Sequence, residues 1–153
     1  MTADKRSAFS VLEAIIVVTF IAVIAAIAVP RLNFGIISRQ RAECVARKIV
    51  TDLRRTRQHA ITNAANNPEG YALNMIGSAP YGGYQIVRLG TSDTLDSCTI
   101  ESRVSCKGGS NFEFGPLGNL KDGSSAELTV ESEGRAFRIS IVPATGAIKC
   151  VEN

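Results

Sequence analysis

The hydrophobic positions along the chain form one long, uninterrupted run near its start. Residues 8–29 read "AFSVLEAIIVVTFIAVIAAIAV", and Glu13 is the one charged residue among them. A helix of this length spans about 33 Å at a rise of ~1.5 Å per residue, which is enough to cross the hydrocarbon core of a bilayer. The run therefore predicts a membrane-spanning helix over residues 9–30.

The residues on either side of this run indicate whether the segment is cleaved off and how it is oriented in the membrane. A cleaved secretory signal would have a shorter apolar region and a small-residue cleavage site, which Pro30-Arg31 does not resemble. Lys5 and Arg6 before the run favour a cytoplasmic N-terminus, with the rest of the chain outside. Three arginines within residues 31–41 weigh against that orientation, so charge alone leaves it open.

A second apolar pattern, with helical spacing, follows Pro30. Proline lacks an amide hydrogen and crowds the preceding turn, so we expect a kink at Pro30 within one long helix. Apolar residues then recur at i, i+3 and i+4, which places them on one side of a helix. They are Ala42, Val45, Ala46, Ile49, Leu53, Ala60 and Ala64. The opposite side carries Arg47, Lys48, Arg54, Arg55 and Gln58. The pattern predicts an amphipathic helical half over residues 31–66, with the helix ending near Asn63 before "NNPEG".

A third pattern, with a period of two, begins after this helix and predicts a β-rich domain over residues 67–153. Short alternating segments separated by glycine turns indicate strands at 83–90, 111–115, 126–132, 135–142 and 146–152. We interpret the polar, turn-rich residues 91–110 as an irregular loop or a weak hairpin. Strands that follow one long helix, instead of alternating with helices, favour an α+β fold with an antiparallel sheet on the apolar face of the helix.

Composition and motifs argue against catalysis. The net charge of +3 is too small to imply nucleic-acid binding by itself. His59 is the one histidine, and no nucleophile or carboxylate pattern accompanies it, so we interpret it as a surface or interface residue. No phosphate-binding glycine loop occurs. We therefore predict that the protein is not an enzyme and has no catalytic, cofactor or metal site and no small-molecule substrate.

Four cysteines allow three complete pairings. Cys98 and Cys106 lie eight positions apart in the turn-rich segment, so we expect a local bridge between them. Cys44 and Cys150 would then join the helix to the last strand, although Cys44 projects away from the predicted core. A zinc site is the alternative, but the sequence has no C-x-x-C motif.

The basic residues of the helix, among them Arg54 and Arg55, allow two interpretations. The simpler one is a solvated helix face, with some charges paired to Glu43 and Asp52. The functional one is contact with phosphate groups of DNA or anionic lipid, which would be sensitive to salt.

The start of the chain resembles the class III signal of type IV pilins and type II secretion pseudopilins. A short basic leader ends in a small residue, Ala8; Phe9 follows, Glu13 is fifth from Phe9 and Pro30 is 22nd. The family usually has glycine where this chain has Ala8. The resemblance implies that a prepilin peptidase removes residues 1–8 by cutting between Ala8 and Phe9, and that the new amino group of Phe9 is methylated. It also implies that Glu13 pairs with that amino group and guides assembly.

The helix after Pro30 and the C-terminal part of the chain resemble the GspH/FimT group of minor pseudopilins and minor pilins, which leaves roughly residues 68–110 unassigned. The helix "RAECVARKIVTDLRRTRQHAITNAANNP" and the C-terminal "NFEFGPLGNL" and "ELTVESEGRAFRISIVPATGAIK" carry this resemblance. It implies a pilin-like α+β fold, with a long N-terminal helix on C-terminal antiparallel sheets. Some FimT-type members are implicated in DNA uptake through basic residues near the C-terminal turn, which here reads "TGAIKC" and contains Lys149.

These resemblances predict a minor pseudopilin in a periplasmic filament of the type II protein secretion system. The expected location is the bacterial inner membrane, crossed once, with the C-terminal domain in the periplasm. The expected partners are other pseudopilins or pilins and the prepilin peptidase. The alternative is a FimT-like minor pilin of a type IV pilus, acting in pilus assembly or in DNA uptake, with DNA as a partner only in that case. A signal-anchored periplasmic enzyme or binding protein is a third interpretation, which no constellation of polar residues favours.

Overall fold

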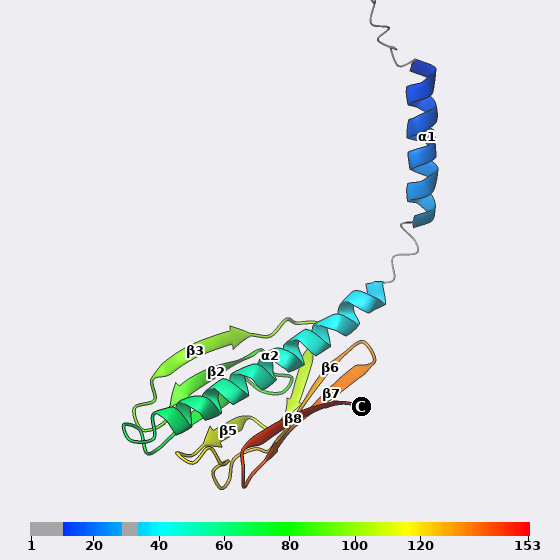
Figure 1. Cartoon of the computed structure of the whole chain (residues 1–153). Coiled ribbons are helices and arrows are strands. Elements are labelled where there is room, and N and C mark those ends of the chain that lie inside the picture. The colour runs from blue at the N-terminus through cyan, green and yellow to red at the C-terminus, as the bar shows by residue number, and fades with distance from the viewer. Residues whose placement is uncertain (1–10, 29–33) are drawn as a thin grey trace, which may run out of the picture. The chain divides into compact units, whose positions relative to one another are not determined.

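The computed structural model describes residues 11–28 and 34–153, and the side chains of 11–26 and 40–153. Contacts divide the chain into two units, Met1–Phe34 and Gly35–Asn153 (Figure 1), which are described separately. Ala8, Phe9 and Pro30 lie outside the described residues. Cleavage, methylation and the kink therefore stay predictions, as does the single membrane-spanning helix that contains Pro30.

Helix α1 (Val11–Ala28) is apolar on all sides, as its sequence predicts. Its large side chains are exposed, and Glu13 lies in its first turn. The hydroxyl of Thr19 donates to the carbonyl of Ile15 at 2.6 Å, so it is satisfied within the helix. Among the helices described within residues 11–28 and 34–153, none meets the length and hydropathy required to cross a membrane.

Helix α2 (Phe34–Thr62) is amphipathic and ends close to the predicted position. The predicted stripe is buried at Ala42, Ala46, Ile49, Leu53 and Ala60. Ala64 lies beyond the end of the helix and is only partly buried. The stripe also contains Thr56, which is fully buried and donates its hydroxyl to the carbonyl of Asp52 at 2.7 Å. This bond lets a polar side chain occupy the core face.

Two four-stranded antiparallel sheets follow α2. The first has the order β3-β2-β1-β5 and the second the order β4-β6-β7-β8. The strands of the first sheet are β1 (Tyr71–Ile76), β2 (Gly83–Arg88), β3 (Thr94–Thr99) and β5 (Asn111–Phe114). Those of the second are β4 (Ser105–Gly108), β6 (Glu127–Ser132), β7 (Arg135–Val142) and β8 (Ala147–Glu152). The unit is thus α+β, and the predicted fold class is confirmed.

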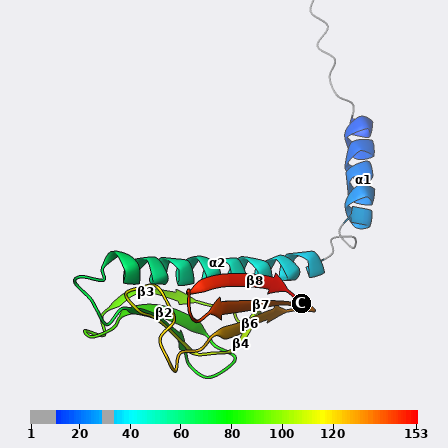
Figure 2. The same cartoon turned by 60° about the horizontal axis from the view of Figure 1, so that its bottom comes forward.

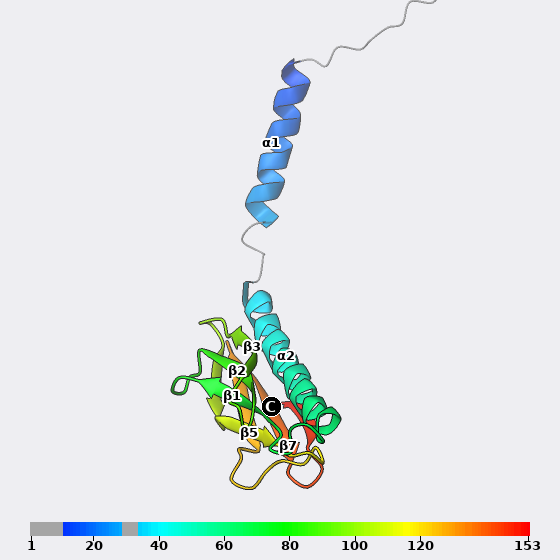
Figure 3. The same ribbon diagram turned by 90° about the vertical axis from the view of Figure 1, so that its left-hand side faces the viewer.

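One core joins α2 to both sheets. Phe112 and Tyr71 of the first sheet and Leu128 and Ile139 of the second belong to the same buried cluster as Leu53 of α2. Each such side chain contributes about 1.5–3 kcal/mol when fully buried. α2 lies lengthwise over the sheets (Figures 2 and 3), with β3 along one of its flanks and β8 along the other (Figure 1). The two edge strands therefore face the polar sides of the helix.

The prediction of an irregular loop or weak hairpin at residues 91–110 is wrong, because β3 and β4 lie there. β3 is an edge strand with five of six residues exposed, so its side chains do not alternate between core and solvent. β4 has only four residues. β1 was also not among the predicted strands, since most of its residues are buried and its sequence shows no alternation.

The turn between β7 and β8 depends on a close backbone approach at Gly146. Its φ is +62°, and a Cβ there would lie 1.9 Å from the carbonyl oxygen of Gly118. Gly123 also has a positive φ, +82°, but a Cβ there would meet nothing within 4 Å. Alanine substitutions at these two glycines can therefore distinguish the cost of the left-handed conformation, which both share, from the cost of the steric clash, which only Gly146 has.

We predict that Gly123→Ala lowers the free energy of unfolding by about 1–2 kcal/mol, the cost of a left-handed conformation. Gly146→Ala should lower it by about 3 kcal/mol or more, because the backbone at Gly118 must also move. Urea unfolding of the full chain in a mild detergent, followed by circular dichroism, measures both. Equal losses in the two variants would contradict the close approach.

Candidate functional site

The basic residues of α2 divide between its two flanks, and those facing β3 are paired. Nη1 of Arg55 lies 2.8 Å from Oδ2 of Asp96, and Nζ of Lys48 lies 2.9 Å from Sγ of Cys98. Arg41 reaches Glu101, just after β3, at 3.7 Å. On this flank, named the β3 flank, the helix contributes cations and the neighbouring chain contributes carboxylates and a thiol.

A cleft of about 210 Å³ lies on the β3 flank, between Lys48, Asp52 and Arg55 of α2 and residues of β2 and β3. At its base the hydroxyl of Tyr84 donates to Oδ2 of Asp52. Burial raises the pKa of Tyr84, and the bond to Asp52 raises it further. Sequence reasoning missed this pair because the residues are 32 positions apart and no motif links them.

A groove of about 560 Å³ runs along the opposite flank, and we name it the β8 groove. It is lined by Arg47, Val50, Thr51 and Arg54 of α2 and by Ile148, Lys149, Cys150 and Val151 of β8. The structure thus brings two of the three predicted phosphate contacts, Arg54 and Lys149, into one groove. The third, Arg55, lies on the β3 flank.

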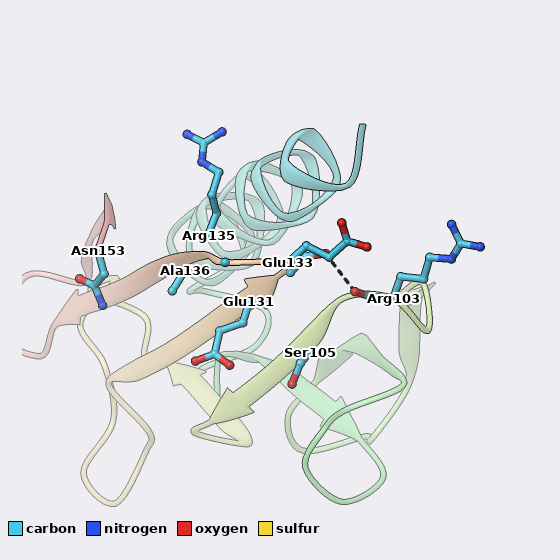
Figure 4. A pocket seen from close by; sticks show the side chains of 9 residues that line it. Arg103, Ser105, Glu131, Glu133, Arg135, Ala136 and Asn153 are labelled. Carbon is cyan, nitrogen blue, oxygen red and sulfur yellow. Dashed lines mark hydrogen bonds between the residues drawn. The ribbon is translucent and has the colours of Figure 1, made fainter. Parts of the chain in front are cut away.

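A third hollow, of about 480 Å³, lies at the hairpin of β6 and β7 (Figure 4). Arg103, Glu131 and Glu133 line it, and the hydroxyl of Ser132 donates to the carbonyl of Arg103 at 3.0 Å. Its charges are mixed, and Glu131 pairs with Lys107 at 3.4 Å. The hydroxyl of Ser132, which also lines the hollow, is thus bonded to a backbone carbonyl and not to a base.

Arg57 and His59, at the end of α2, have structural contacts. Nε of Arg57 donates to the carbonyl of Gly118 at 2.9 Å, and Nη2 donates to the carbonyl of Thr145 at 3.0 Å. Arg57 thereby ties the helix to the β7–β8 turn. The ring of His59 lies 5.6 Å from that of Tyr71, so it packs on the sheet instead of facing solvent alone.

All four cysteines are free, so neither predicted disulfide is formed in the structure. The short connection between Cys98 and Cys106 is no local hairpin, because Cys98 lies in β3 and Cys106 in β4, which belong to different sheets. Cys106 is fully buried, and burial raises the pKa of its thiol to about 11. Cys44 and Cys150 lie on opposite flanks of α2: Cys44 lines a cleft with Cys98, and Cys150 lines the β8 groove.

Metal ligands do not converge within the described part of the chain: residues 11–28 and 34–153 contain no group of three histidine, cysteine or acidic side chains that could hold an ion. Glu13, the predicted assembly residue, is exposed on α1. The amino group of Phe9, its predicted partner, lies outside the described residues.

Comparison with known proteins shows which known fold this chain shares. No protein-family model matches the sequence, and no curated protein is significantly similar to it. The crystal structure of the type IV minor pilin FimU of Pseudomonas aeruginosa superposes with a TM-score of 0.58. The match covers 71% of this chain and 91% of that chain, at 14% sequence identity. This chain has a pilin-like fold. The α+β architecture predicted from the resemblance is thus confirmed at the level of the fold.

The Tyr84–Asp52 pair makes a prediction about pH. Because the pKa of Tyr84 is raised, the folded chain keeps this proton above pH ~10, where the unfolded chain loses it. The free energy of unfolding should therefore fall as the pH rises through this range. Tyr84→Phe should cost about 1.5–3 kcal/mol at pH 8, and this cost should shrink by about 1 kcal/mol between pH 9 and 11.

Urea unfolding at a series of pH values measures the effect. Asp52→Asn is the matched control: it keeps an acceptor for the hydroxyl, and the tyrosine stays buried. Since burial is the largest cause of the raised pKa, this variant should keep most of the alkaline fall. A cost of Tyr84→Phe that does not change with pH would contradict the prediction.

Proposed function

We propose that this protein is a minor pseudopilin, a structural subunit of a periplasmic filament of the type II protein secretion system. The observation that carries the proposal is the pilin-like fold, in which α2 lies over two antiparallel sheets. The leader, Phe9 and Glu13, spaced as in the class III signal, add to it. The GspH/FimT group is the proposed subfamily.

In this proposal the N-terminal segment acts in three steps. Prepilin peptidase removes residues 1–8, the amino group of Phe9 is methylated, and the apolar helix anchors the subunit in the inner membrane with residues 67–153 in the periplasm. In the filament, Glu13 of one subunit pairs with the amino group of Phe9. An unpaired carboxylate costs about 2.5 kcal/mol or more in the apolar part of a bilayer, so the pair favours one axial register between neighbouring helices.

The proposed activity is assembly and not catalysis. The two flanks of α2 and the hairpin hollow are open surfaces with charged side chains. Such surfaces suit contact with other subunits better than the enclosed, mostly apolar sites that bind small molecules. Other pseudopilins or pilins are therefore the proposed partners.

The second candidate is a minor pilin of a type IV pilus that acts in pilus assembly or in DNA uptake. The meeting of Arg54 and Lys149 in the β8 groove favours this candidate. Arg47, in the same groove, already pairs with Glu43 at 2.6 Å, which leaves two cations for phosphate.

The filament proposal predicts that Glu13→Ala and Glu13→Gln both reduce assembly by about tenfold or more, because each leaves the amino group of Phe9 unpaired. Cross-linking and co-purification with partner pilins from inner membranes measure assembly. Glu127→Ala, which removes an exposed carboxylate from β6, is the matched control. Assembly of both Glu13 variants at the wild-type level would contradict the proposed role of Glu13 in assembly.

The DNA candidate predicts that a short duplex shifts in electrophoresis at low salt. Two phosphate contacts give a slope of about −1.8 for the logarithm of the binding constant against that of the salt concentration. Arg54→Ala and Lys149→Ala should each reduce the slope by about 0.9. Arg55→Ala, on the β3 flank, should leave it unchanged. If the duplex shows no mobility shift at low salt, the DNA-uptake candidate is excluded.

A further inference from the structure

The two flanks of α2 differ in what neutralises their charges. On the β3 flank, Arg55 pairs with Asp96, a carboxylate supplied by the edge strand itself. On the other flank the edge strand β8 supplies Lys149, a further cation. Within the described residues, Arg54 and Lys149 have no ion-pair partner. In the β8 groove, Arg54 and Lys149 therefore lack the acidic partner that Arg55 has on the β3 flank.

The edge of β8 is also free of a neighbouring strand. In the part of the chain that the structure describes, β8 pairs with β7 alone. Five of its six residues are exposed, and Val151 is 56% exposed. An edge strand presents unpaired backbone N–H and C=O groups, which can accept an added strand. Val50 and Ile148 line the groove beside this edge and supply apolar surface.

Ion pairs lie beside one end of the groove, at the residue that follows Val151. Arg135 binds Glu152 of β8 through two nitrogens and reaches Glu43 of α2 at 3.6 Å. These contacts satisfy the carboxylates at that end. The unpaired positive charge therefore lies at Arg54 and Lys149.

We propose that an acidic, extended segment of a partner protein adds to the free edge of β8 and occupies the β8 groove. Its backbone hydrogen-bonds to β8, and its carboxylates meet Arg54 and Lys149. Small apolar side chains between the carboxylates cover Ile148, which lies on the opposite face of β8 from Lys149. This inference does not depend on which filament system the chain serves.

Other occupants fit the groove less well. In a second copy of this chain, an added β8 would bring its own Lys149 to the same groove, and like charges there are unfavourable. Duplex DNA would meet the two unpaired cations but would leave the strand edge and the apolar residues of the groove unused. An acidic strand uses all three features.

The test uses the full chain in detergent micelles and the two exposed thiols as reporters. Cys150 lies in the β8 groove, whereas Cys44 lies on the β3 flank. The probe is a peptide of alternating glutamate and valine, and alkylation by iodoacetamide is followed at each cysteine by mass spectrometry. We expect a saturating amount of this peptide to slow alkylation of Cys150 about fivefold or more, with Cys44 unchanged. Hydrogen exchange should show protection of the amides of residues 147–152.

Three further probes identify what the groove recognises. One peptide has lysine in place of glutamate, one has proline in place of valine, and the third probe is a short DNA duplex. We expect none of them to protect Cys150, because the first reverses the charge, the second cannot add as a strand and the third has no strand edge.

Substitutions then test whether Arg54 and Lys149 contribute to peptide binding. Arg54→Glu and Lys149→Glu should each weaken binding of the acidic peptide about tenfold, as fluorescence anisotropy measures. Arg103→Glu, an exposed arginine in the hollow of Figure 4, is the matched control and should change binding less than twofold. Absence of peptide binding would overturn the proposal. So would equal protection by the proline peptide, protection by DNA alone, or protection at β3 or β4 instead of β8.

Discussion

The structure of the unit after Phe34 depends on burial of the apolar stripe of α2. Each sheet has one face that must be removed from water, and the stripe is the surface that both faces share. Ala42 and Ala46 have no exposed area, and their small side chains let the helix lie close to the sheets. The larger Ile49 and Leu53 are fully buried in the one cluster that contains residues of both sheets. A charged substitution in this stripe would therefore separate α2 from both sheets at once.

The same burial determines where the charges lie. Once the stripe faces the core, the cations on either side of it must flank the helix, where the edge strands β3 and β8 run (Figure 1). Exposed ion pairs such as Arg55–Asp96 contribute only about 0.2–1 kcal/mol each, so they do not hold the fold together. Their effect is selective: on the β3 flank the cations have internal partners, whereas in the β8 groove Arg54 and Lys149 have no ion-pair partner among the described residues. The difference between the flanks, and not the number of basic residues, distinguishes a solvated surface from a candidate interaction surface.

The sequence predicted those helices and strands whose own residues show a complete periodic pattern of apolar and polar positions. The predicted strand at 135–142 coincides with β7, because the buried Phe137, Ile139 and Ile141 recur at every second position and Gly134 supplies the turn before them. β3 lacks such a signal, since an exposed edge strand has no core face to mark. The Tyr84–Asp52 pair and the placement of Arg54 and Arg55 on opposite flanks arise only when distant segments pack together. The cysteine pairing failed for the same reason, because spacing along the chain does not show which sheet a strand joins.

A fold shared at 14% identity indicates which features this architecture requires. An amphipathic helix with small and aliphatic residues on one side, and strands that alternate against it, can be built from many sequences. The fold therefore constrains the stripe of α2 and the inner faces of the sheets and leaves the flanks of the helix free to vary. Function resides in such variable surfaces, not in the architecture itself. In this chain the β8 groove is the variable surface on which two cations lack acidic partners among the described residues. A free strand edge lies beside these cations. Partner choice in a filament built from similar folds would depend on surfaces of this kind, because the buried stripe is already occupied within each subunit.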